Sequence, residues 1–282
     1  MEAKKKLKRI LNLFGIAAKM DLVWLLRDTK YALAAISSDT ISNISVVSSV
    51  YLIALRFGGI GGMSVDEVLF MMGYSTIVTG IFILFGSGNN IHISRIIGRG
   101  QLEHLFMQPH SLKVQLITSG FAPFTGSSNF IVGCILLIIS INQLQLRITL
   151  WWIALLIVYL FSTMVIIVAR AYFVSSAAFY APVAAEEIST TAIEGTWQLS
   201  TFPLSGMPAF IQVPLLTILP EGLMAWFPSL CLLGRPPLNL TEFYPLVYAL
   251  VLALAANFIF RKGLNYYVTK GSNRYVPYGF RR

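Results

Sequence analysis

Long apolar stretches separated by short polar segments constrain the fold of this chain more than any other feature. They lie near residues 31 to 55, 67 to 86, 115 to 141, 148 to 172, 203 to 233 and 244 to 260. A helix needs roughly 20 mainly apolar residues to cross about 30 Å of hydrocarbon. With 56% hydrophobic and only 12% charged residues, the chain cannot cover a soluble globule with polar surface. The sequence predicts an all-α integral membrane protein with six transmembrane helices, forming a single domain over residues 1 to 282.

The fifth apolar stretch is longer than one crossing needs, and several prolines interrupt it. Proline removes a backbone donor and breaks a helix, and non-helical backbone at membrane depth needs cover from protein or water. We expect a spanning helix to about Leu219 and then a re-entrant segment over residues 220 to 233, between spans five and six. Pro220, Glu221 and Pro228 mark this segment.

The first 30 residues combine basic and apolar positions. The basic start could open a signal peptide, but Asn12, Lys19 and Asp21 interrupt the apolar run that should follow. Apolar residues recur at spacings of three and four between Leu7 and Leu25, which is typical of an amphipathic helix in the membrane interface. We predict such an interfacial helix over residues 1 to 30, with a solvated basic tail as the alternative.

Positive charge fixes the expected orientation. If the N-terminus is cytoplasmic, most of the 21 Lys and Arg residues fall in cytoplasmic segments, where such residues are retained. Both termini are therefore predicted to be cytoplasmic, in an inner (plasma) membrane. The net charge of +9 follows from this asymmetry and from attraction to anionic lipid. No basic stretch interleaved with aromatic residues indicates a nucleic-acid partner.

Motifs for energy conversion or catalysis are missing from the sequence. There is no GxxxxGK[ST] phosphate loop, GxSxG elbow or HExxH helix, so ATP used in transport would bind to another chain. His92, His104 and His110 lack metal-binding spacing, and we expect no metal site. Cys134 and Cys231 lack CxxC spacing and are expected to be packing residues.

Polar side chains crowd the first apolar stretch, among them Asp39, Ser42, Asn43 and Ser45. Small hydroxyl residues allow close helix packing in membranes, so packing is one interpretation. A carboxylate at mid-bilayer costs roughly 2.5 to 3.5 kcal/mol on insertion scales, so Asp39 should face water, a partner helix or the membrane boundary. The other interpretation is that these four residues line a translocation path.

The most specific feature is the segment over residues 87 to 110, which is amphipathic and ends in a proline. It follows the pattern Gly-x-Leu-acid-x-x-Leu-x-x-Pro with Phe in the second Leu position, and the residues that occupy it are Gly100, Leu102, Glu103, Leu105, Phe106 and Pro109. Here the chain resembles the ABC-2 type of ABC-transporter permease, and is similar to the six-span permeases of daunorubicin- and viologen-type exporters. The resemblance extends to Thr201-Phe-Pro-Leu-Ser, to the Pro-containing segment after Leu219 and to residues 258 to 267.

The resemblance implies a permease subunit of an ATP-driven exporter that is not itself an enzyme. It implies pairing with a second permease, identical or related, and with two cytoplasmic ATPase subunits that carry ATP and Mg, so this chain would hold no cofactor. Residues 87 to 110 would be the cytoplasmic coupling segment, and Arg99 joins the six pattern residues as an ATPase-coupling candidate. Glu221 departs from the apolar residue expected after that proline.

Several alternatives stay open. The chain could be an ATP-independent channel or secondary transporter, or a membrane-embedded enzyme, although internal repeats and clustered catalytic groups are not apparent. The face formed by Leu102, Leu105 and Phe106 could insert into an ATPase groove or pack on the N-terminal helix. Arg170 is expected to extend to the cytoplasmic boundary. A cytoplasmic loop is expected to hold three acidic residues, as a solvated face or as a contact with the ATPase or the basic helix: Glu186, Glu187 and Glu194.

Overall fold

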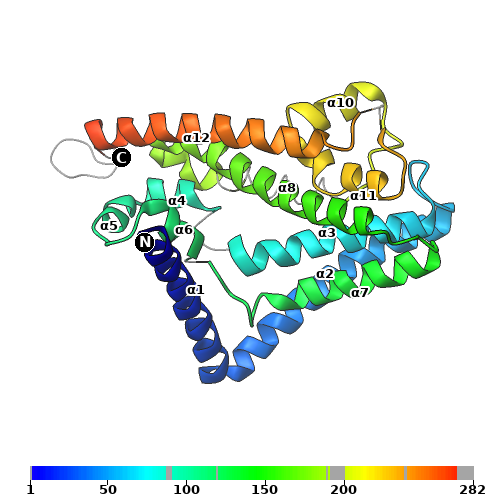
Figure 1. Ribbon diagram of the computed structural model, residues 1–282, viewed down its shortest axis with the longest axis horizontal. Coiled ribbons are helices and arrows are strands. Elements are labelled where there is room, and N and C mark those ends of the chain that lie inside the picture. The colour runs from blue at the N-terminus through cyan, green and yellow to red at the C-terminus, as the bar shows by residue number, and fades with distance from the viewer. Residues whose placement is uncertain are drawn as a thin grey trace.

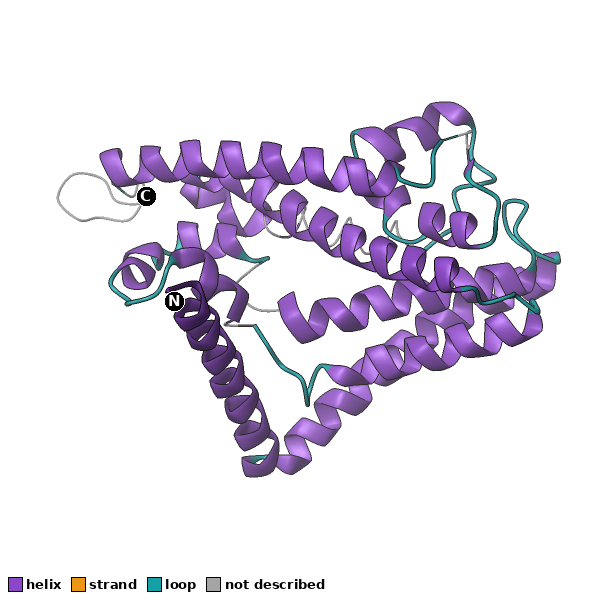
Figure 2. Ribbon diagram, viewed as in Figure 1, coloured by secondary structure: helices purple, strands orange, loops and turns teal. Residues whose placement is uncertain are grey.

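The computed structural model describes residues 2–86, 91–118, 120–188, 190, 201–237 and 240–271, and the regular elements among these residues are helices, without a β-strand. Four helices are long and apolar enough to cross a membrane: α2 (Thr29–Phe57), α3 (Val65–Gly86), α8 (Leu150–Ser175) and α12 (Tyr244–Lys270). A bent pair, α10 (Ala209–Thr217) followed by η3 (Pro220–Leu223) and α11 (Trp226–Leu232), would make a fifth if counted as one span. The predicted all-helical, multi-pass architecture is confirmed at this level. Figure 2 shows that helices make up most of the described chain, with longer loops around α10 and α11 and before α7.

The long helices form an elongated bundle (Figure 1). On one side α8 packs along α12, and on the other α3 packs along α7 (Ser127–Gln143) with α2 beside both. One end of the bundle, here called the N-terminal end, carries α1 (Glu2–Arg27) and the short helices α4 (Ile93–Gly98) and α5 (Leu102–Phe106). The elements α10 and α11 lie at the opposite end.

Glycines allow α3 and α7 to approach each other closely. A Cβ on Gly80 of α3 would lie 2.3 Å from the Phe130 nitrogen, and one on Gly133 of α7 would lie 2.5 Å from the Ile77 nitrogen. Small residues let helix backbones come together in a membrane, where apolar surface alone gives little drive for association. This contact places the first turns of α7 beside the middle of α3 and α2.

The third apolar stretch is not one helix. It consists of α6 (Leu112–Thr118) and the 17-residue α7, joined by residues that are not helical. The Asp21 carboxylate of α1 binds this junction: it accepts hydrogen bonds from the backbone nitrogens of Phe124 (2.8 Å) and Thr125 (3.2 Å) and from the Thr125 hydroxyl (2.6 Å). Phe14 adds an edge-to-face contact with Phe121, with ring centroids 5.1 Å apart. The predicted N-terminal helix is thus present and is anchored to the chain at this break.

The fifth apolar stretch also differs from prediction. No single straight helix runs to Leu219: residues 201 to 208 are not helical, and α10 has nine residues, only about 14 Å of helix. Glu186 contacts α4 at the N-terminal end, whereas Gly206 approaches Gly61 at the opposite end. Between Glu186 and Gly206 the chain therefore passes from the N-terminal end of the bundle to the opposite end. The sequence instead predicts a cytoplasmic loop after Glu186. Sequence hydropathy missed this because it cannot distinguish an apolar crossing from an apolar segment that covers one end.

Candidate functional site

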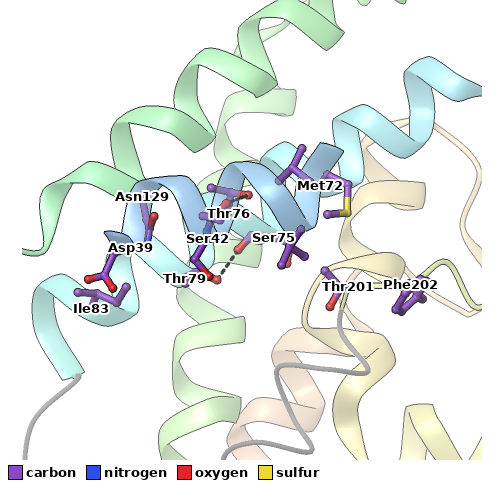
Figure 3. Close-up of a pocket in the computed structure, with 13 residues that line it drawn as sticks. Asp39, Ser42, Met72, Ser75, Thr76, Thr79, Ile83, Asn129, Thr201 and Phe202 are labelled. Carbon is purple, nitrogen blue, oxygen red and sulfur yellow. Dashed lines mark hydrogen bonds between the residues drawn. The ribbon is translucent and has the colours of Figure 1, made fainter. Parts of the chain in front are cut away.

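A cavity of about 710 Å³ lies on the side of the bundle between α2, α3 and α7. Three of the four predicted path residues line it: Asp39, Ser42 and Asn43. Figure 3 shows Asp39 at one end of the cavity and Thr201 and Phe202 at the other, so the cavity extends along the helices. The structure therefore brings together most of the predicted polar group.

The fourth predicted path residue, Ser45, does not line the cavity. Its hydroxyl donates to the Ile41 carbonyl (2.7 Å), and the Ser49 hydroxyl donates to the Ser45 carbonyl (2.7 Å). These bonds satisfy the hydroxyls within α2 itself. Ser45 is exposed, so its packing role stays a prediction.

Sequence reasoning missed the polar residues on the other walls of the cavity. They are Ser75, Thr76 and Thr79 of α3 and Asn129 of α7. The Thr76 hydroxyl donates to Asn43 Oδ1 (3.4 Å), which joins the α2 and α3 walls. A signal was present, because the hydroxyl residues of α3 recur three and four residues apart and therefore share one face of the helix.

The α4 and α5 segment sits in a second hydrophobic cluster at the N-terminal end. Leu102 is fully buried there, with Ile97 of α4, Phe179 of η1 (Ser176–Phe179) and Phe260 of α12. Leu102 therefore cannot contact a partner, and the prediction that Leu102, Leu105 and Phe106 insert together is wrong for that residue. Among the described residues this cluster packs on α8, η1 and α12, and packing on the N-terminal helix stays a prediction.

The apolar tip of this segment is exposed. Phe106 and Met107 are 44% and 76% exposed, Pro109 is exposed, and Leu105 is half-buried against the cluster. Gln115 holds the following turn, because its side-chain nitrogen donates to the carbonyls of Leu105 (2.9 Å) and His110 (2.5 Å). Residues 87 to 90 of the predicted coupling segment lie outside the described residues. The buried part of the segment, around Ile97 and Leu102, is called the base, and the exposed pair Phe106 and Met107 is called the tip.

Charged residues fix the base of the tip. Arg95 and Arg99 pair with Glu186 at 2.6 and 2.9 Å, so this glutamate contacts α4 instead of forming a merely solvated face. Gly100 has φ of 70°, a left-handed conformation that suits glycine at the end of α4. Glu103 accepts a hydrogen bond from the Tyr267 hydroxyl (3.3 Å) of α12. Glu187 is exposed, and Glu194 lies outside the described part of the chain.

His92 lies beside the same charges. Burial lowers its pKa from the ordinary value and the positive charge of Arg95 lowers it further, while Glu186 acts in the opposite sense.

The three residues predicted to mark a re-entrant segment lie in η3 and α11. Pro220 begins η3, Pro228 lies in the first turn of α11, and both are buried. Glu221 is paired with Arg170 of α8, so Arg170 does not extend to the cytoplasmic boundary as expected. The axes of the flanking pieces are bent by 73°. Bonds from Trp152 to the Leu232 carbonyl and from Tyr244 to the Leu216 carbonyl attach this unit to α8 and α12.

The helical bundle, its polar lateral cavity and its exposed apolar tip define a multi-pass membrane transport component. The family model described as ABC-2 family transporter protein matches residues 43–271, so the chain belongs to the ABC-2 transporter permeases. Comparison with curated proteins gave no match, and comparison with solved structures gave none either.

Proposed function

We propose that this chain is the permease subunit of an ATP-driven exporter and forms half of its translocation path. Family membership supports a membrane transport component without hydrolase activity of its own. ATP and Mg would bind to separate cytoplasmic ATPase subunits, and a second permease, identical or related, would complete the path. The observation that carries the proposal is the exposed pair Phe106 and Met107 on an otherwise buried base.

The proposed topology has six crossings with both termini cytoplasmic. Five of them are α2, α3, α6 with α7, α8 and α12, and the remaining one would connect Glu186 at the N-terminal end with Gly206 at the opposite end. The N-terminal end of the bundle then faces the cytoplasm, with α1 in the interface. The unit α10, η3 and α11 enters from the outer face and returns to it, as a re-entrant segment does. The positions of the described elements and the positive-inside rule support this proposed arrangement.

The tip would transmit motion from the ATPase to the membrane helices. An ATPase that binds Phe106 and Met107 moves α5, and Leu102 of α5 is packed against Phe179 and Phe260. Interiors are close-packed, so displacement of Leu102 is passed on to α8 and α12. Arg99, Gly100, Glu103 and Leu105 would hold the tip in position through the contacts described above.

The cavity between α2, α3 and α7 would be the cargo-contacting surface of this half. It opens on the side of the bundle, and a second permease placed against α2 would close it. Exposed apolar residues lie along α2, including Ile41, Leu52 and Phe57. A substrate would then move along the seam, past Asp39 and toward Phe202.

Co-purification tests the proposal. Tagged chain is purified from membranes of its own host in mild detergent, and proteins with a phosphate loop are quantified by mass spectrometry. We expect an ABC ATPase with wild type and at least tenfold less with Phe106→Asp/Met107→Asp, because burying two unpaired carboxylates in an apolar contact is costly. The matched control is Ile148→Asp, an exposed apolar residue in the turn before α8, at the opposite end and outside α2. Absence of any ATPase, or equal recovery with the double variant, would contradict the proposal; conduction by the chain alone would favour a channel.

A further inference from the structure

A second cavity, of about 680 Å³, lies between α3, α6, α8 and α12, in the half of the bundle toward the N-terminal end. It shares no lining residue with the cavity between α2, α3 and α7. We infer that this second cavity binds one anionic phospholipid of the surrounding membrane, held as a resident lipid away from the proposed translocation path. The inference goes beyond the proposed transport function and does not depend on it.

The length of the cavity matches the acyl chains of one leaflet. Its wall on α8 extends from Phe161 to Tyr172, which is roughly 16 Å of helix at 1.5 Å per residue. One leaflet contributes about half of the ~30 Å hydrocarbon core. A phospholipid chain therefore fits along α8 within a single leaflet, with its headgroup toward the N-terminal end of the bundle.

The cavity is apolar and opens to the side of the bundle. Phe85, Ile117 and Phe161 line it and are exposed, so its rim faces the hydrocarbon of the membrane. Small side chains, Ala169 of α8 and Ala253 of α12, leave room between these two helices. Acyl chains can therefore enter from the membrane without any movement of the helices.

Positive charge marks where the headgroup binds. Among the lining residues in the described chain, Lys113 of α6 is the single charged one. Its Nζ donates to Asn257 Oδ1 of α12 (3.1 Å), and an ammonium group has three donors, so two remain for a phosphate. The contact also holds the ammonium group against α12, at the wall of the cavity.

Arg261 adds a second cation beside the first. It lies four residues after Asn257 and therefore on the same face of α12, one turn nearer to the N-terminal end of the bundle. It is exposed, and in the described ranges no ion pair joins it to a carboxylate. Two basic residues above an apolar cavity favour an anionic headgroup, whereas the choline cation of phosphatidylcholine would be repelled by them.

The bound lipid would also support the base of the coupling segment. Leu116 and Phe260 line the cavity and belong to the hydrophobic cluster in which Leu102 is buried. A ligand that binds only the folded chain raises its stability by mass action. A lipid in contact with α6, α8 and α12 would therefore hold together the helices on which the base packs.

Native mass spectrometry of the purified chain in mild detergent tests the inference. The chain is titrated with dioleoylphosphatidylglycerol or with dioleoylphosphatidylcholine, and the fraction with one bound lipid is measured. Phosphatidylglycerol should bind at least about tenfold more tightly, because each basic residue contributes about fivefold, which corresponds to about 1 kcal/mol. Lys113→Gln/Arg261→Gln should remove this preference and leave phosphatidylcholine binding unchanged. Glutamine at position 113 keeps a donor for Asn257, so the contact between α6 and α12 is retained.

Lys262→Gln is the matched control for charge. It makes the same change next to Arg261 but outside the cavity lining, and it should bind phosphatidylglycerol like wild type. Equal affinity of wild type for the two lipids would overturn the inference. An equal loss of phosphatidylglycerol binding in Lys262→Gln and in the double variant would overturn it too, because attraction would then come from net charge alone.

The apolar part of the site has its own test. Ala253→Phe fills the cavity and should weaken phosphatidylglycerol binding roughly tenfold, because the displaced chain carbons lose their burial. Leu254→Phe, on the exposed face of the same turn, should have no effect. Millimolar sn-glycerol 3-phosphate should not displace the lipid. Displacement by this soluble phosphate, or unchanged lipid binding in Ala253→Phe, would show that the cavity does not hold the acyl chains.

Discussion

Arg170 of α8 and Glu221 of η3 form an ion pair in the interior of the bundle, with side chains only 12% and 1% exposed. The pair joins a membrane helix to the bend between α10 and α11. Glu221 was the residue that departed from the family pattern, and Arg170 was expected at a boundary. The pairing accounts for both differences, because a buried charge needs a partner of opposite sign.

Removing one member of this pair should be strongly destabilising. Glu221→Gln or Arg170→Gln leaves a buried charge without its counter-ion, which costs about 3 to 5 kcal/mol. Arg170→Leu/Glu221→Leu removes both charges and should cost less than the sum of the single leucine variants. Thermal unfolding of detergent-purified protein, read by size-exclusion chromatography, measures this. Additive effects would show that the two residues act independently.

The close contact of α3 and α7 gives a second prediction. Gly133→Leu would place a side chain against the Ile77 backbone and force the helices apart, and overpacking of this kind costs about 1 to 3 kcal/mol. The matched control is Gly15→Leu in α1, where a Cβ meets no atom within 4 Å. The melting temperature should fall for Gly133→Leu and not for the control. A similar fall in both would point to a loss of insertion instead of a loss of packing.

Orientation is tested by cysteine labelling in intact cells, in a background with Cys134→Ala and Cys231→Ala. Gln101→Cys lies in the exposed turn between α4 and α5, and Arg147→Cys lies in the exposed turn before α8. An impermeant maleimide should label the second and spare the first until the membrane is opened. Labelling of Gln101→Cys from outside would invert the proposed topology.

Much of the fold was predictable from hydropathy, since four of the six apolar stretches became single long helices. The exceptions have a common cause. Residues 120 to 126 and 201 to 208 lie within apolar stretches but are not helical, because they contain Pro and Gly and because tertiary contacts, such as that of Asp21 with Thr125, hold their backbone. Local composition carries no information on contacts made by a residue one hundred positions away.

The candidate site was predictable only in part, for a similar reason. Asp39 could be identified from the sequence because a charge is rare in a span. Asn129 could not, because it lines the cavity only when α7 packs against α3. At the coupling segment, periodicity identified one apolar face but not its partner. Leu102 is buried within the chain, whereas Phe106 is exposed. Their spacing places both on one helical face, so the sequence alone predicts the same contact for both.

The rate of ATP hydrolysis by this chain, measured alone and with its co-purifying ATPase in nanodiscs, tests the central claim most directly. The chain alone should hydrolyse no ATP, because its sequence contains no phosphate loop. The reconstituted complex should hydrolyse ATP at a rate that depends on the permease and falls with Phe106→Asp/Met107→Asp. Hydrolysis by the isolated chain, or an ATPase rate unaffected by the presence and variant of the permease, would contradict the account.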